Sequence, residues 1–574
     1  MKKLILIFTA AILAVSCSDS LEDLNENIKD PANVSGESLF ASAQKQLADQ
    51  VVTPNVNLNN LRLWTQQLQE TTYTDESRYN QVTRSIPDNH WRVIYRDVLK
   101  DLDQASINIE ATTYLTDELN GRKPNKQAII EVLKVYAYSN LVETFGNIPY
   151  TEALDINNLL PKYDDAQTVY KDLLVRLTAA INSMDTSLNS FESGEDLIYR
   201  GDVSKWKKFA NSLKLRMGLT IADFNAGLAQ STVESAFLSG VFTSNADNAS
   251  YAYRNAAPNN NPMNNNLVLS GRNDYVAGAT LVNMLNNVND PRSAAYFNGK
   301  VEFNYPWDPT DPTKGNPVAS VSTSGNVTTI TMTKELDNLP AIGDEIYLQV
   351  EDAESILLGT ASNVTSTTLE INNINTSVNA GDGIGIFSYV GGVIGSRSSY
   401  GVYTHVSDRI VNASEPGVIM SYDEVEFLLA EAAERGFNVG GNAESHYVAG
   451  ITASFNYWGV SDVASYLANP KVNYTSALAA STSNPKWKMV IGEQAYFGLY
   501  NRTFAPYLSV RRLDYPILVN PVRAQSGFPV RYTYPVGEQT LNGANYNDAS
   551  DALGPLGDVP EQQLFWDKFY TFDF

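Results

Sequence analysis

The 574-residue sequence has a single cysteine, Cys17, and only three histidines, His90, His405 and His446. A lone cysteine excludes an internal disulfide and a zinc site built from several cysteines. The histidines are isolated from one another, so we expect packed or surface side chains rather than metal ligands or bases. The motifs HExxH, GxSxG and the P-loop are also missing. We therefore predict no cofactor, no metal and no enzymatic activity.

Basic residues are few compared with acidic ones. Lys and Arg number 41 and Asp and Glu 64, which gives a net charge of −23. So acidic a surface repels nucleic acid and anionic lipid, and neither is expected as a partner. Apolar residues still make up 43% of the chain, enough for a large core, and its 32 tyrosines suit ring stacking better than proton transfer.

The amino end has the pattern of a secretory signal peptide. Two lysines precede the apolar run of residues 4–15, and a small residue precedes the expected cleavage point. The run is shorter than the roughly 20 residues of a membrane-spanning helix, and no later run reaches that length. We predict that residues 1–16 are removed.

Cys17 follows directly, and residues 13–17 (LAVSC) resemble a bacterial lipobox, in which the cysteine sulfur receives a diacylglycerol. The alternative is an ordinary signal peptide with an incidental cysteine. Residues 17–35 are polar and acidic and are expected to form a lipidated tether. The membrane would then be contacted through the lipid anchor only.

Apolar residues recur at helical spacing over residues 36–228. The predicted helices lie near residues 61–70, 89–102, 124–146, 166–184 and 204–224. Pro124 and Gly146 mark the start and end of the third. Helices in series with short polar loops favour stacked helical hairpins of the tetratricopeptide type. Trp64, Trp91 and Trp206 lie at helical spacing with other apolar residues and are expected in the core.

The amino-acid composition changes twice in the middle of the chain. Residues 246–317 are rich in Asn, Gly and Pro and are predicted to be mostly loop. In residues 318–387 Thr, Ser, Val and Ile dominate, and Ile346, Leu348 and Val350 alternate with polar residues. This period of two predicts a small all-β insert of about six strands.

Helices are expected again from Ser421 onward. Ser421 and Glu424 have the spacing of a capping box, and further helices are predicted near residues 442–457 and 486–500. The last stretch, 502–574, is rich in Pro, Gly, Tyr and Asn, and is expected to form ordered loops.

Several short stretches, in this order, resemble the SusD/RagB family of nutrient-binding surface lipoproteins. They are residues 146–154 (GNIPYTEAL), 215–222 (LRMGLTIA), 419–432 (IMSYDEVEFLLAEA), 511–516 (RRLDYP), 531–535 (RYTYP) and 566–569 (WDKF). The resemblance implies a mostly α, SusD-like fold: a tetratricopeptide-like scaffold with a loop-rich ligand-binding half. Residues 36–317 and 388–574 would form its N-terminal and C-terminal parts, and the insert 318–387 departs from the family pattern.

The resemblance also implies a place and a partner. The family sits on the outer membrane facing the cell exterior, as a hinged lid on a SusC-like TonB-dependent transporter. Acidic residues soon after the lipidated cysteine, here Asp19, Glu22 and Asp23, are similar to its surface-export signal.

Two regions combine aromatic rings, which stack on sugar faces, with polar groups that pair with hydroxyls. One follows the 61–70 helix and matches the family's ligand loop; the other lies within residues 259–307. The candidate ligand-binding residues are Tyr73, Asp75, Arg78, Tyr79, Arg272, Asn273, Tyr275, Tyr305 and Trp307.

We expect an oligosaccharide ligand, and a peptide bound in the manner of RagB is the alternative. Two further classes stay open. A surface glycoside hydrolase would need a pair of carboxylates that the sequence does not single out. An adhesin would use the β insert as its working part.

Overall fold

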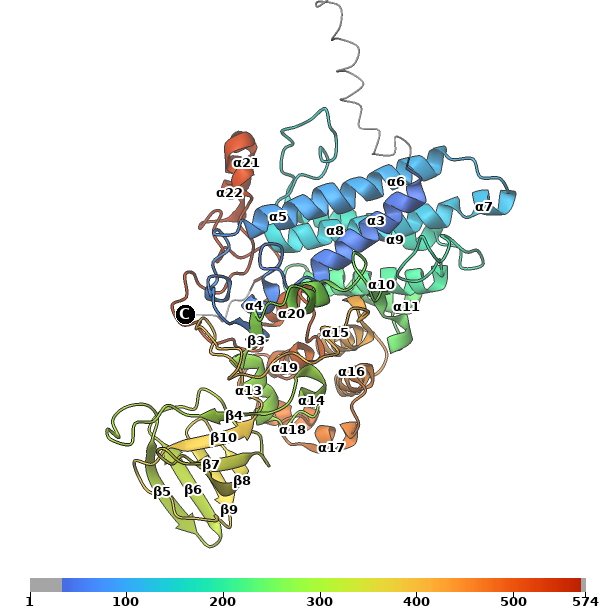
Figure 1. Ribbon diagram of the computed structural model, residues 1–574. Coiled ribbons are helices and arrows are strands. Elements are labelled where there is room, and N and C mark those ends of the chain that lie inside the picture. Colours follow the sequence, from blue (N-terminus) through green and yellow to red (C-terminus); the bar gives the residue numbers. More distant parts are fainter. Residues whose placement is uncertain (1–33, 569–574) are drawn as a thin grey trace, which may run out of the picture.

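The structure is a computed structural model that describes residues 34–568. Cys17, the expected signal peptide and nearly all of the tether lie outside the described residues. Figure 1 shows a body of packed helices, with a small sheet set apart at lower left. In the part described, no helix combines the length and the apolar character needed to cross a bilayer.

Helices dominate the first part of the described chain, and they pack as neighbouring pairs. In chain order they are α3 (Gly36–Val52), α4 (Leu61–Trp64), α5 (Ile86–Arg92), α6 (Lys100–Ala111), α7 (Asp117–Gly121), α8 (Lys123–Phe145), α9 (Ala166–Ser183), α10 (Val203–Thr220) and α11 (Ala226–Ser239). A π-helical segment, Val93–Leu99, joins α5 to α6. Helix α3 packs on α6, α8 on α9 and α10 on α11. The predicted mostly α scaffold of helical hairpins is confirmed.

Helix α8 shows how the sequence sets its own boundaries. Pro124 lies in the first turn, where its missing N–H leaves no hydrogen bond unmade. Gly146 follows the last turn at φ +92, a left-handed conformation that suits glycine. The predictions for this helix are confirmed, and so is the burial of Trp64 and Trp206 in the core. Trp91 is only half-buried and packs against the edge of this core.

The helix predicted over residues 61–70 is wrong in its second half. Helix α4 ends at Trp64, and Gln66 has a positive φ of 57 that stops the helix. The chain then forms strand β1 (Leu68–Glu70), which pairs with β3 (Tyr275–Ala277). A partner more than 200 residues away therefore overrides the local helical pattern.

The segment predicted to be mostly loop contains several short elements. They are β2 (Ala249–Tyr251), α12 (Pro262–Asn264), β3, α13 (Ala279–Asn287) and α14 (Ser293–Tyr296). Strand β2 pairs with β11 (Gly417–Met420). These elements connect the helical body to the sheet.

The β insert is a seven-stranded antiparallel sheet with the strand order β4-β10-β7-β8-β9-β6-β5. Its strands are β4 (Val301–Asn304), β5 (Val318–Ser324), β6 (Val327–Met332), β7 (Glu345–Leu348), β8 (Ile356–Val364), β9 (Thr368–Asn372) and β10 (Ile384–Ser388). It has a core cluster of its own, separate from that of the helical body. The sheet extends beyond residues 318–387, because β4 pairs with β10.

The last part of the chain is again helical. Its helices are α15 (Tyr422–Glu434), α16 (Ala443–Trp458), α17 (Val463–Ala468), α18 (Tyr474–Ala480), α19 (Lys486–Gly498), α20 (Phe504–Leu513), α21 (Val536–Leu541) and α22 (Gly543–Leu553). Helices α20, α21 and α22 all lie within 502–574, so the prediction of loops throughout this stretch is wrong at these three helices; α20 packs on α19. The capping box is wrong as well. The Ser421 hydroxyl donates to Asp423, and Glu424 pairs with Arg216 instead.

Candidate ligand-binding surface

The pairing of β1 with β3 brings the two predicted ligand-binding regions together. Residues 71–80 leave β1 at the same end of the pair at which residues 270–274 enter β3, because the strands are antiparallel. The amide of Thr71 donates to the carbonyl of Asp274 at 2.9 Å. Loops that are far apart in sequence therefore lie side by side.

A buried carboxyl at the end of β1 holds the 71–80 loop in place. Oε2 of Glu70 accepts hydrogen bonds from the amide of Ser77 at 3.0 Å and from its hydroxyl at 2.9 Å. Burial raises the pKa of Glu70 to about 9, and the neighbouring Glu76 acts in the same direction. Glu70 is therefore protonated at neutral pH, and the loop is fixed by a neutral buried group.

Two more segments meet the same loop. Nε of Arg78 donates to the carbonyl of Gly395 at 2.7 Å. The backbone N–H of Gln525 donates to the carbonyl of Arg78 at 2.8 Å. The backbone N–H of Val522 donates to the carbonyl of Ile394 at 2.9 Å. We call this region the β1–β3 surface. It consists of residues 71–80, 270–274, 394–400 and 519–526.

Six of the nine predicted ligand-binding residues lie within the β1–β3 surface, and five of them are at least partly exposed: Tyr73, Asp75, Arg78, Arg272 and Asn273. The side chain of Tyr73 is 65% exposed, which leaves its ring available for stacking. Nε of Arg272 pairs with the neighbouring Asp274 at 2.7 Å. An exposed ring beside amide, carboxylate and guanidinium groups is the equipment that a polar, hydroxyl-rich ligand requires.

Three of the predicted tyrosines are buried: Tyr79, Tyr275 and Tyr305 are 1, 7 and 2% exposed. The hydroxyl of Tyr79 accepts from Nε2 of Gln66 at 2.9 Å, and that of Tyr275 donates to the carbonyl of Pro54 at 2.6 Å. Buried rings with bonded hydroxyls serve packing. We therefore remove these three from the set of candidate ligand contacts.

Trp307 and Tyr305 belong to the β insert and not to the β1–β3 surface. The indole N–H of Trp307 donates to the carbonyl of Gly381 at 2.8 Å. Its ring lies against Gly383, where a Cβ would come within 2.5 Å of the indole. Trp307 is thus half-buried by its contacts with the turn before β10, which indicates a packing role.

The β1–β3 surface also has an apolar part that the sequence did not predict. Val519 and Val522 are exposed, as is Ile517 just before them, and Nε2 of Gln66 donates a 2.6 Å hydrogen bond to the carbonyl of Val519. No periodicity marks these residues. The only sequence signal is a run of aliphatic residues in an irregular, proline-containing segment.

The histidines are packed, as expected. His90 is fully buried between Gln50 and Asn140, and burial lowers its pKa to about 4. Nδ1 of His446 lies 2.7 Å from Glu426. Within residues 34–568 no three His, Cys, Asp or Glu side chains are grouped so that they could hold a metal ion.

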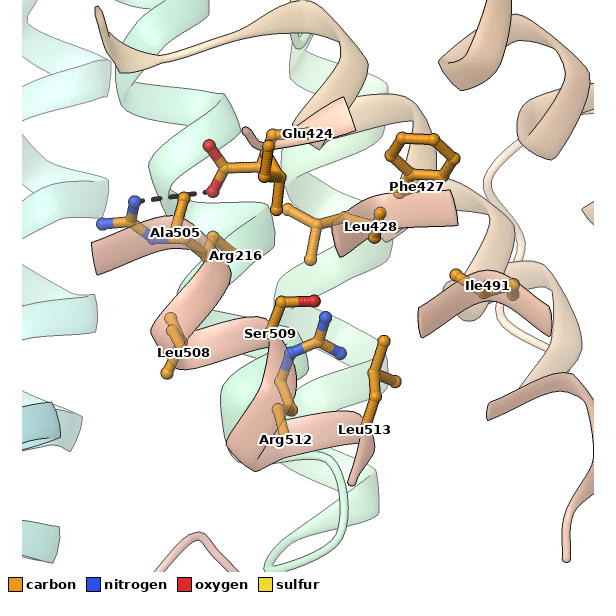
Figure 2. Close-up of a pocket in the computed structure, with 12 residues that line it drawn as sticks. Arg216, Glu424, Phe427, Leu428, Ile491, Ala505, Leu508, Ser509, Arg512 and Leu513 are labelled. Atoms are coloured by element: carbon orange, nitrogen blue, oxygen red, sulfur yellow. Dashed lines mark ion pairs between the residues drawn. The ribbon is translucent and has the colours of Figure 1, made fainter. Parts of the chain in front are cut away.

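A small cavity lies among α10, α15, α19 and α20, and Figure 2 shows the charged side chains that line it. Nη1 of Arg216 lies 3.6 Å from Oε1 of Glu424, and Arg512 on α20 pairs with Glu431. Burial raises the pKa of Glu424, although Arg216 opposes the shift. A volume of about 20 Å³ holds roughly one water and no sugar ring. Glu424 and Glu431 therefore form ion pairs inside the helical body.

The helical hairpins and the loop-built surface define the class: a mostly α protein with a small β insert. Residues 28–339 and 371–535 match a family model described as SusD-like, starch-binding and associating with the outer membrane. The chain belongs to this SusD-like family. Between the two matched segments, residues 340–370 lie in the β insert. A comparison with curated proteins gave no match.

Solved structures of SusD homologues share the fold. A homologue from Bacteroides thetaiotaomicron is 20% identical with a TM-score of 0.63, covering 94% of this chain and 100% of the other. A chitin-binding homologue from Flavobacterium johnsoniae is 20% identical with a TM-score of 0.64, covering 93% and 98%. One from Bacteroides uniformis is 22% identical with a TM-score of 0.64, covering 92% and 99%. The predicted SusD-like fold is confirmed.

Proposed function

We propose that the protein is a cell-surface lipoprotein that captures an oligosaccharide on the β1–β3 surface without altering it. The observation that carries the proposal is the convergence of the 71–80 and 270–274 loops on one surface of a SusD-like fold. Tyr73 supplies the stacking ring, and Asp75, Asn273 and Arg272 supply groups for sugar hydroxyls.

The family description and the relatives favour a glycan over a peptide. The family model is described as starch-binding, and two of the similar structures are named chitin-binding. The anchor of the protein is the acylated Cys17. Its partner is a SusC-like TonB-dependent transporter, to which it delivers the ligand as a lid.

Binding is tested by isothermal titration with maltohexaose, chitohexaose and a tryptic digest of casein. We expect one of the two oligosaccharides to bind and Tyr73→Ala to weaken that binding about tenfold, since a central aromatic contact carries a large share of binding energy. Leu115→Ala, at a fully exposed residue outside the β1–β3 surface, is the matched control. Binding of the casein digest alone would identify a peptide receptor instead, and silence with all three probes would contradict capture.

Anchoring and partnership are tested in cells. A tagged protein should fractionate with the outer membrane and purify together with a TonB-dependent barrel, identified by mass spectrometry. Cys17→Ala should release the protein from the membrane, because its acyl chains are its only anchor. Retention of the Cys17→Ala variant in the membrane fraction would refute the lipid anchor.

A further inference from the structure

The outer face of the β insert carries a groove across β4, β10 and β7, three adjacent strands at one edge of the sheet. Gly385 of β10 lies opposite Asn304 of β4 on one side and opposite Tyr347 of β7 on the other. Partners in a ladder share a face, so Asn304 and Tyr347 stand on either side of a position without a side chain. The alternate residues, such as Ile346 and Ile386, point the other way into the core of the insert.

Gly385 leaves room for the side chain of Asn304, which forms one wall of the groove. A Cβ at Gly385 would lie 2.4 Å from Oδ1 of Asn304. The resulting cavity measures about 450 Å³ and is bounded at one end by residues 353–355, the turn before β8. This volume lies within the range of small-molecule sites, about 300–1,000 Å³, and it is far larger than the cavity of Figure 2.

The chemistry of the lining is specific. The hydroxyl of Tyr347 donates to Oε2 of Glu345 at 2.5 Å, which fixes the direction of the ring. Leu357, 39% exposed, lies opposite Tyr347 in the ladder with β8, next to the residues that line the cavity. Asn304, Glu302 and Glu354 place an amide and two carboxylates along the rim.

The charge of the lining narrows the ligand class. No lysine or arginine is among the residues that line the cavity, and two of them are glutamates. An anionic ligand would be repelled. In the described residues no group of three carboxylates or imidazoles could hold a metal ion there. A tyrosine ring beside amide and carboxylate groups fits an uncharged sugar unit, with the C–H face of the sugar on Tyr347 and its hydroxyls on the polar groups.

We propose that this groove is a second glycan site, which binds uncharged sugar units of a polysaccharide independently of the β1–β3 surface. Asn304 and Glu302 bond to the sugar hydroxyls, and Tyr347 carries the stacking. Two sites on one molecule raise the effective concentration of a long chain at the β1–β3 surface. The inference does not depend on the β1–β3 surface being a ligand site.

The test is titration of the full-length protein with maltohexaose and chitohexaose, with hydrogen–deuterium exchange of residues 351–357 as a local readout. At least one probe should bind and slow exchange there. Tyr347→Ala should weaken this site about tenfold. Gly385→Val should fill the groove and abolish it, while Tyr347→Phe should retain most of the affinity. Ser322→Ala, on the far edge strand β5, is the control for folding and should match the wild type.

The two proposed sites are refuted by different results. If Tyr347→Ala and Gly385→Val both bind like the wild type, or if neither probe slows exchange in residues 351–357, the groove is not a glycan site. If Tyr73→Ala has no effect while Tyr347→Ala removes binding, the β1–β3 surface is refuted and the groove stands.

Discussion

At the scale of single residues, the helical body carries charged groups deep inside, and several of them are balanced by a partner of opposite charge. Glu431 on α15 is fully buried; it pairs with Arg435 at 2.9 Å and also with Arg512. Asp290 and Arg292 form another fully buried pair at 2.6 Å. A buried charge is tolerated only while its partner is present, so truncating one member costs far more than the pair contributes.

Glu431→Ala should therefore destabilise the protein by about 3–5 kcal/mol, because Arg512 keeps a buried charge without its carboxylate. The measurement is chemical denaturation followed by circular dichroism. Glu110→Ala, at the exposed end of α6, is the control and should change stability by less than about 0.5 kcal/mol. Equal effects of the two variants would contradict the structural role of the Glu431 pairs.

Glu493 predicts a pH dependence of the opposite sign to that of an ordinary paired carboxylate. Burial raises its pKa from 4.5 to about 7. The folded state thus holds the proton more tightly than the unfolded state does, so the associated stability is complete below about pH 4.5. It decreases as the pH rises to about 7 and is constant above.

Glu493→Gln removes this contribution. The free energy of unfolding of the variant, relative to the wild type, should rise by about 3 kcal/mol between pH 4.5 and pH 8. Denaturation curves at four or five pH values measure it, and other titrating groups cancel in the difference. Glu110→Gln should show a difference independent of pH. A flat difference for Glu493→Gln would disprove the raised pKa.

At the scale of elements, the sequence predicts the helices that have clear boundary residues or a long apolar face. Helix α8 has its proline and glycine, and α9 and α19 have long apolar faces, so their positions follow from local rules. Strand β1 could not be found in this way. It has only three residues and forms by pairing with β3. No local pattern in the sequence shows that a segment more than 200 residues away is its partner.

The candidate ligand contacts divide for the same reason. Sequence reasoning selects aromatic and polar residues in loops, but it cannot tell an exposed ring from a buried one. Tyr73 and Tyr79 lie six positions apart in one loop, yet only Tyr73 is exposed. The difference arises from tertiary packing, because Tyr79 packs against Phe528 of the C-terminal part.

Glu70 provides a test of how β1 fixes the ligand loop. Since Glu70 is protonated at neutral pH, Glu70→Gln should change stability by less than about 1 kcal/mol. Glu70→Ala leaves the buried Ser77 amide without an acceptor and should cost about 1–3 kcal/mol. Exchange of the Ser77 amide with deuterium should accelerate in the alanine variant only. Similar exchange in both variants would show that another contact holds the loop.

At the scale of the whole molecule, the β insert is a nearly independent unit. Its core cluster is separate from that of the helical body. Side chains of α13 reach it: Nδ2 of Asn283 donates to the carbonyl of Asp337 at 2.9 Å, and Nδ2 of Asn286 to that of Leu339 at 2.7 Å. A small set of polar contacts and two chain crossings connect two cores, so the helical body should fold without the insert.

The strand register of β4 and β10 shows where the insert can be deleted to test this. Val301 of β4 lies opposite Ser388 of β10, and opposite residues in such a ladder have Cα atoms about 4.5–5.5 Å apart. An Asn-Gly turn in place of residues 302–387 can therefore join them as a two-residue hairpin. The shortened protein should keep its helical circular dichroism and its Tyr73-dependent binding, and it should lose binding at the insert groove.

The control is the full-length double variant Asn283→Ala/Asn286→Ala, which removes the α13 contacts but keeps the groove. It should bind at both sites. If the shortened protein loses the Tyr73-dependent binding while the double variant keeps it, the insert supports the β1–β3 surface and is not an independent unit. The shortened protein also tests the adhesin hypothesis in cells. If the insert were an adhesin, cells that carry the shortened protein would lose attachment while nutrient uptake continued.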